Sequence, residues 1–170
     1  MTFPLKAIDA AFDLLPAKMD SAEARVLLLA IGLQESRFLH RRQLVGNPPR
    51  PTGPAMGFWQ FEKGGGVKGV LTHASSKTHA RRVCEAQDVP AEAQSVWTSL
   101  QDDDVLAAAF ARLLLWTDPK ALPEVGDVDG AWSLYHRTWR PGAYDRGTAQ
   151  AKSELRAKWG RNYAQAMEAV

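Results

Sequence analysis

Cysteine is nearly absent from this chain of 170 residues, which contains only Cys84. A lone cysteine cannot form an intrachain disulfide, and no cysteine or histidine stands at metal-ligand spacing from it. The four histidines also form no metal-binding pattern such as HExxH. We therefore expect no disulfide bond, no metal site and no cofactor.

An excess of charge of one sign is also missing. The chain has 21 Lys and Arg against 19 Asp and Glu, a net charge of +2, which does not support a dedicated nucleic-acid binder. The longest apolar run, residues 26–33, contains a glycine and is too short to cross a bilayer. The first 25 residues contain four acidic side chains and do not resemble a secretory signal. The sequence predicts a protein made in the cytoplasm and not inserted in a membrane.

Hydrophobic residues make up 45% of the chain, enough for one sizeable core at this length. The apolar positions recur mostly with helical period, and no stretch alternates clearly enough to require a strand. We expect an all-α fold, or an α-dominated fold with at most a small hairpin, as one domain over residues 1–170. No coiled-coil seam is visible, so a monomer is expected. The expected helices cover residues 4–15, 21–34, 67–73, 76–87, 91–100, 104–116, 127–137 and 149–167.

The segment 46–66 differs from the rest of the chain. Four prolines lie between residues 48 and 54, and three consecutive glycines lie at 64–66. Prolines at this density cannot continue a helix, and glycines give the backbone high freedom. We expect a structured loop or lid bordering a cleft. Within it lies the unusually aromatic hexapeptide 57–62, Gly-Phe-Trp-Gln-Phe-Glu.

Glu35 is the strongest candidate for chemistry because it stands at the end of the most apolar predicted helix. A carboxyl group held against apolar surface favours its protonated form near neutral pH, as a general acid requires. The alternative is an exposed glutamate at a helix end, paired with Arg37 or Arg41. Position alone does not decide between these interpretations.

A second carboxylate, Glu62, follows 27 residues after Glu35. Two carboxylates across a cleft are the usual equipment for breaking glycosidic bonds, although Glu62 is equally compatible with a solvated loop position. Aromatic side chains near both candidates suggest a sugar-binding cleft, in which we expect Trp59 and Tyr135 to face the ligand. Gln60, an amide in an apolar stretch, needs hydrogen-bond partners if it is buried, and a substrate is one possible partner.

These features together resemble the lysozyme-like superfamily of peptidoglycan-cleaving enzymes, particularly phage lysins and soluble lytic transglycosylases. Glu35-Ser36-Arg37-Phe38 resembles the family's catalytic Glu-Ser motif. Gly57-Phe58-Trp59-Gln60 resembles its Gly-Leu-Met-Gln motif, with aromatic residues in place of the aliphatic pair. Tyr135, followed by Trp139 to Gly142, stands where the family has a Tyr-Asn pair before a glycine, and His136 replaces the asparagine. The three segments span residues 32–142 in the family's order.

The resemblance implies a lysozyme-like fold that binds peptidoglycan glycan strands. It also implies cleavage of the β-1,4 bond between N-acetylmuramic acid and N-acetylglucosamine, with Glu35 as general acid. Ser36, Gly57, Trp59, Gln60 and Tyr135 would then bind substrate. Such an enzyme would act at the cell wall, after release by another factor or as part of a phage particle.

Two mechanisms remain open at this point. In a lytic transglycosylase the 6-hydroxyl of the muramic acid closes onto C1, and the same glutamate acts as base. In a hydrolase a second carboxylate, for which Glu62 is the candidate, acts as nucleophile or activates water. The three motifs favour the transglycosylase slightly.

Two other classes of function also remain open. A non-catalytic module on a degenerate lysozyme scaffold would bind peptidoglycan, or serve as a phage structural part, without cleaving anything. A helical nucleic-acid-binding protein would use arginines as phosphate contacts, namely Arg37, Arg41, Arg42, Arg81 and Arg82.

Overall fold

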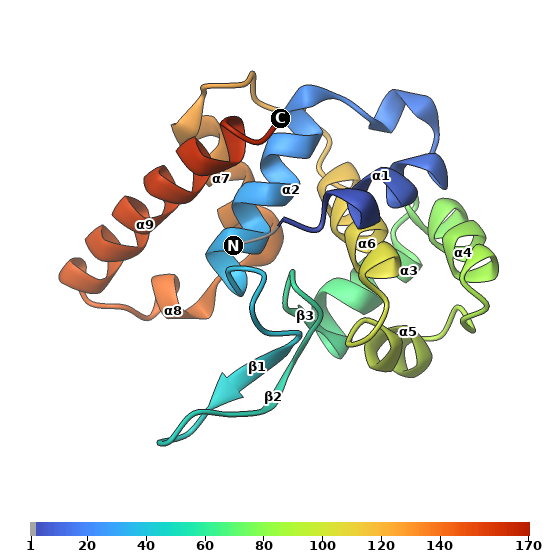
Figure 1. The fold of residues 1–170 in the computed structure, drawn as a ribbon, viewed down its shortest axis with the longest axis horizontal. Coiled ribbons are helices and arrows are strands. Elements are labelled where there is room, and N and C mark those ends of the chain that lie inside the picture. The colour runs from blue at the N-terminus through green and yellow to red at the C-terminus, as the bar shows by residue number, and fades with distance from the viewer. Residues whose placement is uncertain (1–2) are drawn as a thin grey trace.

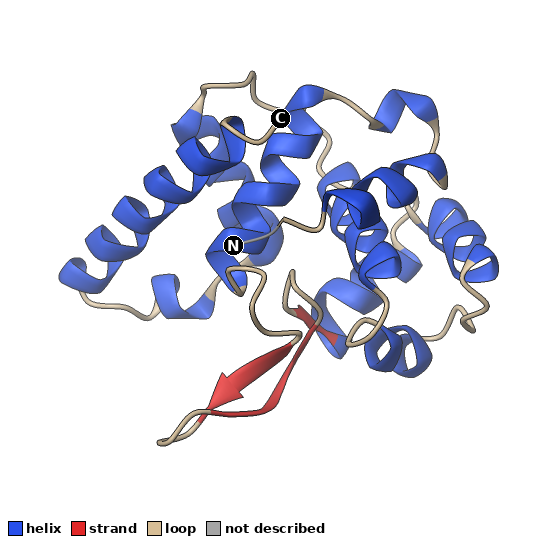
Figure 2. Cartoon of the chain, in the orientation of Figure 1, coloured by secondary structure: helices blue, strands red, loops and turns tan. Residues whose placement is uncertain are grey.

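The computed structural model describes residues 3–170 and is dominated by helices, with one small sheet. Figure 1 follows the chain, and Figure 2 shows the sheet projecting from one side of the helical body. The prediction of an α-dominated fold with at most a small hairpin is therefore confirmed. No helix within residues 3–170 is long and apolar enough to span a membrane.

The helices lie close to the ranges expected from the sequence. Two of them, at 104–116 and 149–167, coincide with the expectation, six others differ by a few residues at their ends, and the short helix at 142–145 was not expected. Their bounds are α1 Leu5–Asp13, α2 Ala22–Glu35, α3 Lys68–Thr72, α4 Lys77–Ala86, α5 Ala93–Ser99, α6 Asp104–Trp116, α7 Val128–Trp139, α8 Gly142–Asp145 and α9 Ala149–Met167. A 3-10 turn, η1, covers Ala17–Met19, and a π turn, η2, covers Lys63–Val67.

The segment 46–66 is mostly not a loop, and that expectation was wrong. It contains two strands, β2 Arg50–Met56 and β3 Phe61–Glu62, and β1 Arg42–Val45 precedes it; all three pair antiparallel in the order β1-β2-β3. Pro51 and Pro54 are tolerated because the fixed φ of proline fits an extended strand, and β3 pairs only with the far end of β2. Because the segment also lacks an alternation of polar and apolar residues, β2 could not be recognised as a strand from the sequence.

Helix α2 lies in the middle of the core. Ser21 caps its N-terminus by accepting a hydrogen bond from the Ala24 backbone N–H. Every residue from 26 to 34 is buried, since α2 packs against α9 on one side and α6 on another. A helix without a polar face needs such neighbours all round it. Figure 1 shows α2 between α7 and α9 on one side and α1 and α6 on the other.

Candidate active site

Glu35 is the last residue of α2 and lies at the edge of the buried core. Its side chain is partly buried, and the Tyr135 hydroxyl, from α7, donates a hydrogen bond to Glu35 Oε1 at 2.6 Å. Among the described residues Glu35 forms no ion pair, and Arg41 pairs with Asp104 instead at 2.7 Å. The structure therefore does not place Glu35 in the surface ion pair with Arg37 or Arg41 that was the alternative interpretation.

Tyr135 is held by aromatic neighbours. Its ring stacks on Trp159 of α9, with ring centroids 5.0 Å apart and an interplanar angle of 13°, and it also contacts Trp132 at 5.4 Å. The ring is buried, with only 2% of the residue surface exposed. The packing of Trp132 and Trp159 against this ring fixes the direction of the Tyr135 hydroxyl toward Glu35.

Burial raises the pKa of Glu35 to about 7, although the Tyr135 hydrogen bond and the positive charge of Lys158 both act to lower it. Burial also raises the pKa of Tyr135, with the negative charge of Glu35 adding to the effect, so the phenol stays protonated as a donor. Glu35 thus has comparable populations of acid and carboxylate at neutral pH. A group in this state can both give and accept a proton near pH 7.

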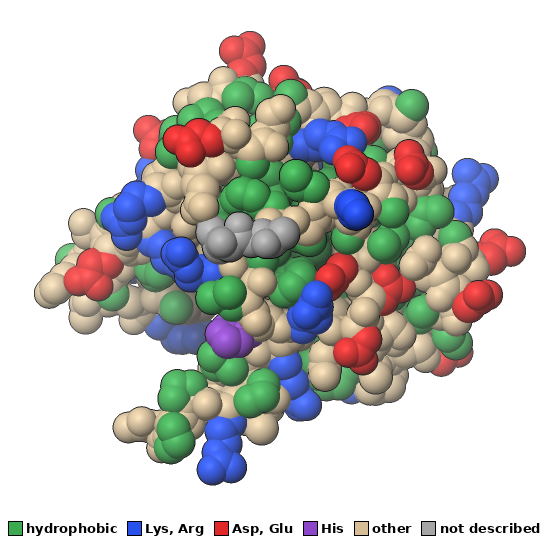
Figure 3. Space-filling model, in the orientation of Figure 1, with side chains coloured by type: hydrophobic (Ala, Val, Ile, Leu, Met, Phe, Trp, Pro, Cys, Tyr) green, Lys and Arg blue, Asp and Glu red, His purple; other side chains and the backbone are tan. Residues whose placement is uncertain are grey.

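A groove with a cavity volume of about 1200 Å³ passes this carboxyl group. The sheet lines one side through β1, β2 and the β3–η2 segment, while α7, α8 and Leu155 of α9 line the other. The surface in Figure 3 is indented between the sheet and the end of α9 that lies next to α8. Glu35, Gln60, Glu62 and Tyr135 all line this groove, so the fold brings together four of the residues expected at the site.

Two carboxylates besides Glu35 line the groove, and they differ in environment. Glu62 is exposed on the short strand β3 and has no side-chain hydrogen bond or ion pair within residues 3–170. Asp118 is held by two hydrogen bonds from the Arg137 guanidinium, at 2.6 and 3.0 Å. These bonds lower the pKa of Asp118, which keeps it ionised and unsuited to donate a proton.

Trp59 does not face the groove, and its expected role in stacking on a ligand was wrong. Its side chain is fully buried and donates a hydrogen bond to the Leu28 carbonyl at 2.8 Å. Its backbone carbonyl accepts from the Trp139 indole at 2.9 Å. Trp59 therefore anchors the 57–60 turn to α2 and α7.

Ser36 and Gly57 also hold the structure together rather than line the groove. The Ser36 hydroxyl is buried and donates to the Phe58 carbonyl at 2.7 Å, which ties the end of α2 to the 57–60 turn. Gly57 has φ +73°, and a Cβ there would lie 2.9 Å from the Leu100 carbonyl oxygen. Their expected substrate contacts are corrected to a supporting role. Gln60 lines the groove, with its Nε2 donating to the Gly57 carbonyl at 2.8 Å.

We predict that Gly57→Ala lowers the free energy of unfolding by about 2–3 kcal/mol, because a side chain strains the left-handed backbone and collides with a carbonyl. Urea denaturation measures the change. Gly64→Ala is the matched control, since a Cβ at Gly64 meets nothing within 4 Å and φ is not positive there. Equal stability of Gly57→Ala and wild type would contradict this account of the turn.

Several residues at the site escaped sequence analysis. Lys158 and Asn162 of α9 both bond to Gln34, the neighbour of Glu35. Tyr144 of α8 was missed as well, and its partly exposed ring lines the groove together with Trp139 of α7, which the sequence had already indicated. No local pattern could identify Lys158 or Asn162, because only the docking of α9 on α2 brings them to the site.

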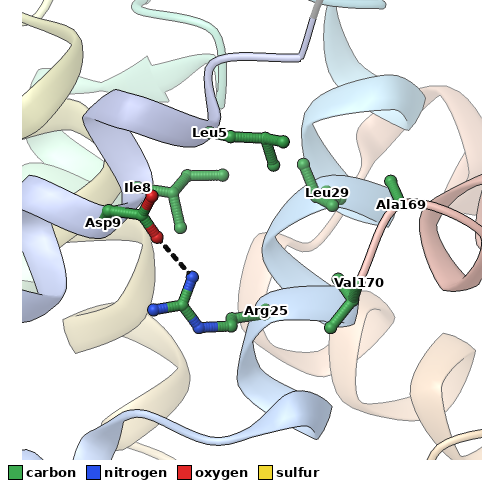
Figure 4. A pocket seen from close by; sticks show the side chains of 7 residues that line it. All are labelled: Leu5, Ile8, Asp9, Arg25, Leu29, Ala169 and Val170. Atoms are coloured by element: carbon green, nitrogen blue, oxygen red, sulfur yellow. Dashed lines mark hydrogen bonds and ion pairs between the residues drawn. The ribbon is translucent and has the colours of Figure 1, made fainter.

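A second, smaller pocket lies between α1, α2 and the end of the chain. Its volume is about 310 Å³, and its lining is mostly apolar, as Figure 4 shows. The one acidic side chain that lines it, Asp9, is ion-paired with Arg25 at 2.6 Å, and Arg25 also pairs with Asp20. The side chains that line this pocket offer no free acid or base, which leaves the groove as the candidate site.

Within residues 3–170 no group of three or more His, Cys, Asp or Glu side chains is arranged to hold a metal ion. Burial raises the pKa of the Cys84 thiol to about 11, so it is protonated at neutral pH and unsuited as a nucleophile.

Comparisons with protein-family models, with curated proteins and with solved structures find no match. The groove and the residues that line it are therefore the features from which a function can be inferred.

Proposed function

We propose that this protein degrades peptidoglycan by cleaving the β-1,4 bond between N-acetylmuramic acid and N-acetylglucosamine, with Glu35 as general acid. The observation that carries this proposal is the Glu35 carboxyl group, which has a pKa of about 7 and lines a large groove. General acids work best when their pKa lies near the working pH. The similarity of the Glu-Ser, Gly-x-x-Gln and Tyr segments to the lysozyme-like motifs supports the same reaction.

The shape and lining of the groove support a polymeric sugar as substrate. Its volume of about 1200 Å³ lies above the 300–1,000 Å³ typical of small-molecule pockets. Trp139 and Tyr144 expose part of their rings there, and flat aromatic faces can stack on sugar rings. Arg140 and Arg146 line the groove without an ion pair in the described part of the chain. Their charges suit a strand that carries lactyl and peptide carboxylates.

The proposed reaction begins with protonation of the glycosidic oxygen by Glu35, whereupon the bond from that oxygen to C1 of the muramic acid breaks. The 6-hydroxyl oxygen of the same sugar then bonds to C1, and its proton passes to the Glu35 carboxylate. The products are a 1,6-anhydro end and a new free hydroxyl, and no water is consumed. Tyr135 donates a hydrogen bond to Glu35 and directs its carboxyl group throughout.

The environment of Glu62 favours this single-glutamate route over hydrolysis. A nucleophile or base must be held in a defined position, usually by neighbouring hydrogen bonds. Glu62 is exposed and has no such bond within the described residues, whereas Glu35 is held by Tyr135. A hydrolase would need Glu62 to be fixed by the substrate itself.

Incubation of purified sacculi with the protein tests the proposal. We expect release of soluble fragments by the wild type, and a rate within about threefold of it for Glu62→Gln, because that variant keeps the acid. A loss of 10²-fold or more in Glu62→Gln would instead assign a catalytic role to Glu62 and favour the hydrolase. Binding to sacculi without any release would support the non-catalytic module and overturn the proposal.

A nucleic-acid-binding function receives less support from the arrangement of the arginines. Arg41 is engaged by Asp104, and Arg42 donates to the Gly53 carbonyl at 3.2 Å.

The proposed substrate lies in the cell wall. The protein would therefore act there, with access through another factor or as part of a phage particle.

A further inference from the structure

Two side chains of α9, one helical turn apart, hold the end of α2 that carries Glu35. Lys158 Nζ donates to the backbone carbonyl of Gln34 at 2.5 Å, and Asn162 Nδ2 donates to Gln34 Oε1 at 2.8 Å. Gln34 directly precedes Glu35. From this geometry we propose that Lys158 is a positioning residue, which fixes the end of α2 and stabilises the charged form of Glu35. The role in catalysis rests on the proposed function.

The hydrogen bonds from Lys158 and Asn162 to Gln34 satisfy polar groups that would otherwise be unpaired in the interior. The last carbonyls of a helix have no partner within the helix, and the C-terminal end of a helix favours a nearby cation. Lys158 supplies both a donor and a positive charge at the end of α2. Gln34 and Asn162 are only 6% and 3% exposed, so their mutual hydrogen bond is shielded from water. Glu35 is therefore joined to α9 through its neighbour in the chain.

Charged and titratable groups approach Glu35 from each element that packs near it. Tyr135 bonds to it from α7, and Lys158 approaches from α9. Glu62 lines the same groove from the sheet, and Arg37 follows α2 on the exposed surface. Among them Lys158 is the cation whose charge lowers the pKa of Glu35, and it does so without forming an ion pair within 4 Å.

Lys158 is itself partly buried, and burial lowers its pKa while the charge of Glu35 acts to raise it. A cation in a partly desolvated position acts more strongly on a neighbouring carboxyl group than a solvated one does. Lys158 donates to the Gln34 carbonyl and makes no hydrogen bond or ion pair to Glu35 among the described residues, so the Glu35 oxygens stay free for Tyr135 and the substrate. It stabilises the carboxylate that forms after Glu35 has protonated the leaving oxygen.

Substitution at position 158 separates the charge from the hydrogen bond. Lys158→Gln keeps an N–H donor, on a side chain one bond shorter, but carries no charge, Lys158→Arg keeps the charge, and Lys158→Met loses both. Arg161→Gln is the matched control, because it removes an exposed cation from the same helix. Carbon-13 NMR titration of the glutamate side-chain carboxyls follows each variant, and Glu35 is identified by the signal missing from Glu35→Gln.

We expect the titration midpoint of Glu35 to rise by about one pH unit in Lys158→Gln, to recover in Lys158→Arg, and to stay unchanged in Arg161→Gln. The rate of sacculus digestion also depends on pH, and the part of that pH profile that follows the titration of Glu35 should move by the same amount. An unchanged midpoint in Lys158→Gln, even with lower thermal stability, would reduce Lys158 to a helix cap and overturn the proposal.

The titration needs no substrate, so the two proposals fail separately. A midpoint that moves in a protein that never cleaves sacculi would support the action of Lys158 on Glu35 and refute the glycosidase. Cleavage that depends on Glu35, together with a Glu35 titration midpoint that is unchanged by substitution at position 158, would support the glycosidase and refute the role of Lys158.

Discussion

Glu35→Gln is expected to lower the rate of fragment release from sacculi by about 10²- to 10⁴-fold, the usual contribution of a general acid. Glutamine has the shape of glutamate, and its amide oxygen can accept the hydrogen bond that Tyr135 now gives to the carboxyl group. The variant therefore keeps the geometry of the groove but has no proton to donate. The initial rate of solubilisation near pH 6.5 measures the effect.

The matched control for this loss is Glu168→Gln, which makes the same chemical change at an exposed position at the end of α9. It should digest sacculi at the wild-type rate. Circular dichroism of both variants should coincide with that of the wild type. Wild-type digestion by Glu35→Gln would remove the basis for assigning the acid to this residue.

Glu35→Gln is also expected to stabilise the fold at alkaline pH, by about 3 kcal/mol. The pKa of Glu35 is raised from 4.5 to about 7, which means that the fold disfavours the carboxylate. Below pH 4.5 Glu35 is protonated in both the folded and unfolded chains and costs nothing. As pH rises from 4.5 to 7, the unfolded chain ionises first and the wild type loses stability. Above pH 7 the full difference remains.

Urea denaturation of wild type and Glu35→Gln at pH 4, 6 and 8 measures this dependence. The difference in unfolding free energy should grow between pH 4 and pH 8, while the other titrating groups cancel because both proteins share them. A difference that is constant with pH would show that Glu35 titrates normally, and the assignment of Glu35 as an acid near neutral pH would lose its physical basis.

Helices with a strong apolar period could be predicted closely from the sequence. The bounds of α6 and α9 agree with the expected ranges, because the aliphatic stripe of α6 and the aromatic spacing of α9 both follow the helical repeat. The sheet could not be predicted in this way. The strand β2 contains Pro51, Pro54 and a glycine, and its burial does not alternate along its length. Its pairing with β1 is a tertiary property that no local pattern records.

The candidate site was predictable in part. Glu35 could be singled out as a candidate because it ends a helix whose residues 26–33 are apolar, although its position alone did not decide between a buried acid and a surface ion pair. Trp59 was misjudged because an aromatic ring in a glycine-rich turn can turn toward either a ligand or the core, and its indole N–H is used by the Leu28 carbonyl. Lys158 could not be found at all, because 123 positions separate it from Glu35 and only the packing of α9 on α2 joins them.

In the proposed reaction Glu35 cleaves glycosidic bonds of peptidoglycan by serving as both acid and base. Mass spectrometry of the soluble products of purified sacculi, treated with wild type and with Glu35→Gln, tests this claim. We expect 1,6-anhydro muropeptides from the wild type and almost none from the variant. Muropeptides with reducing ends would contradict the single-glutamate route and assign a second catalytic role to Glu62, and the absence of any product from the wild type would contradict the claim as a whole.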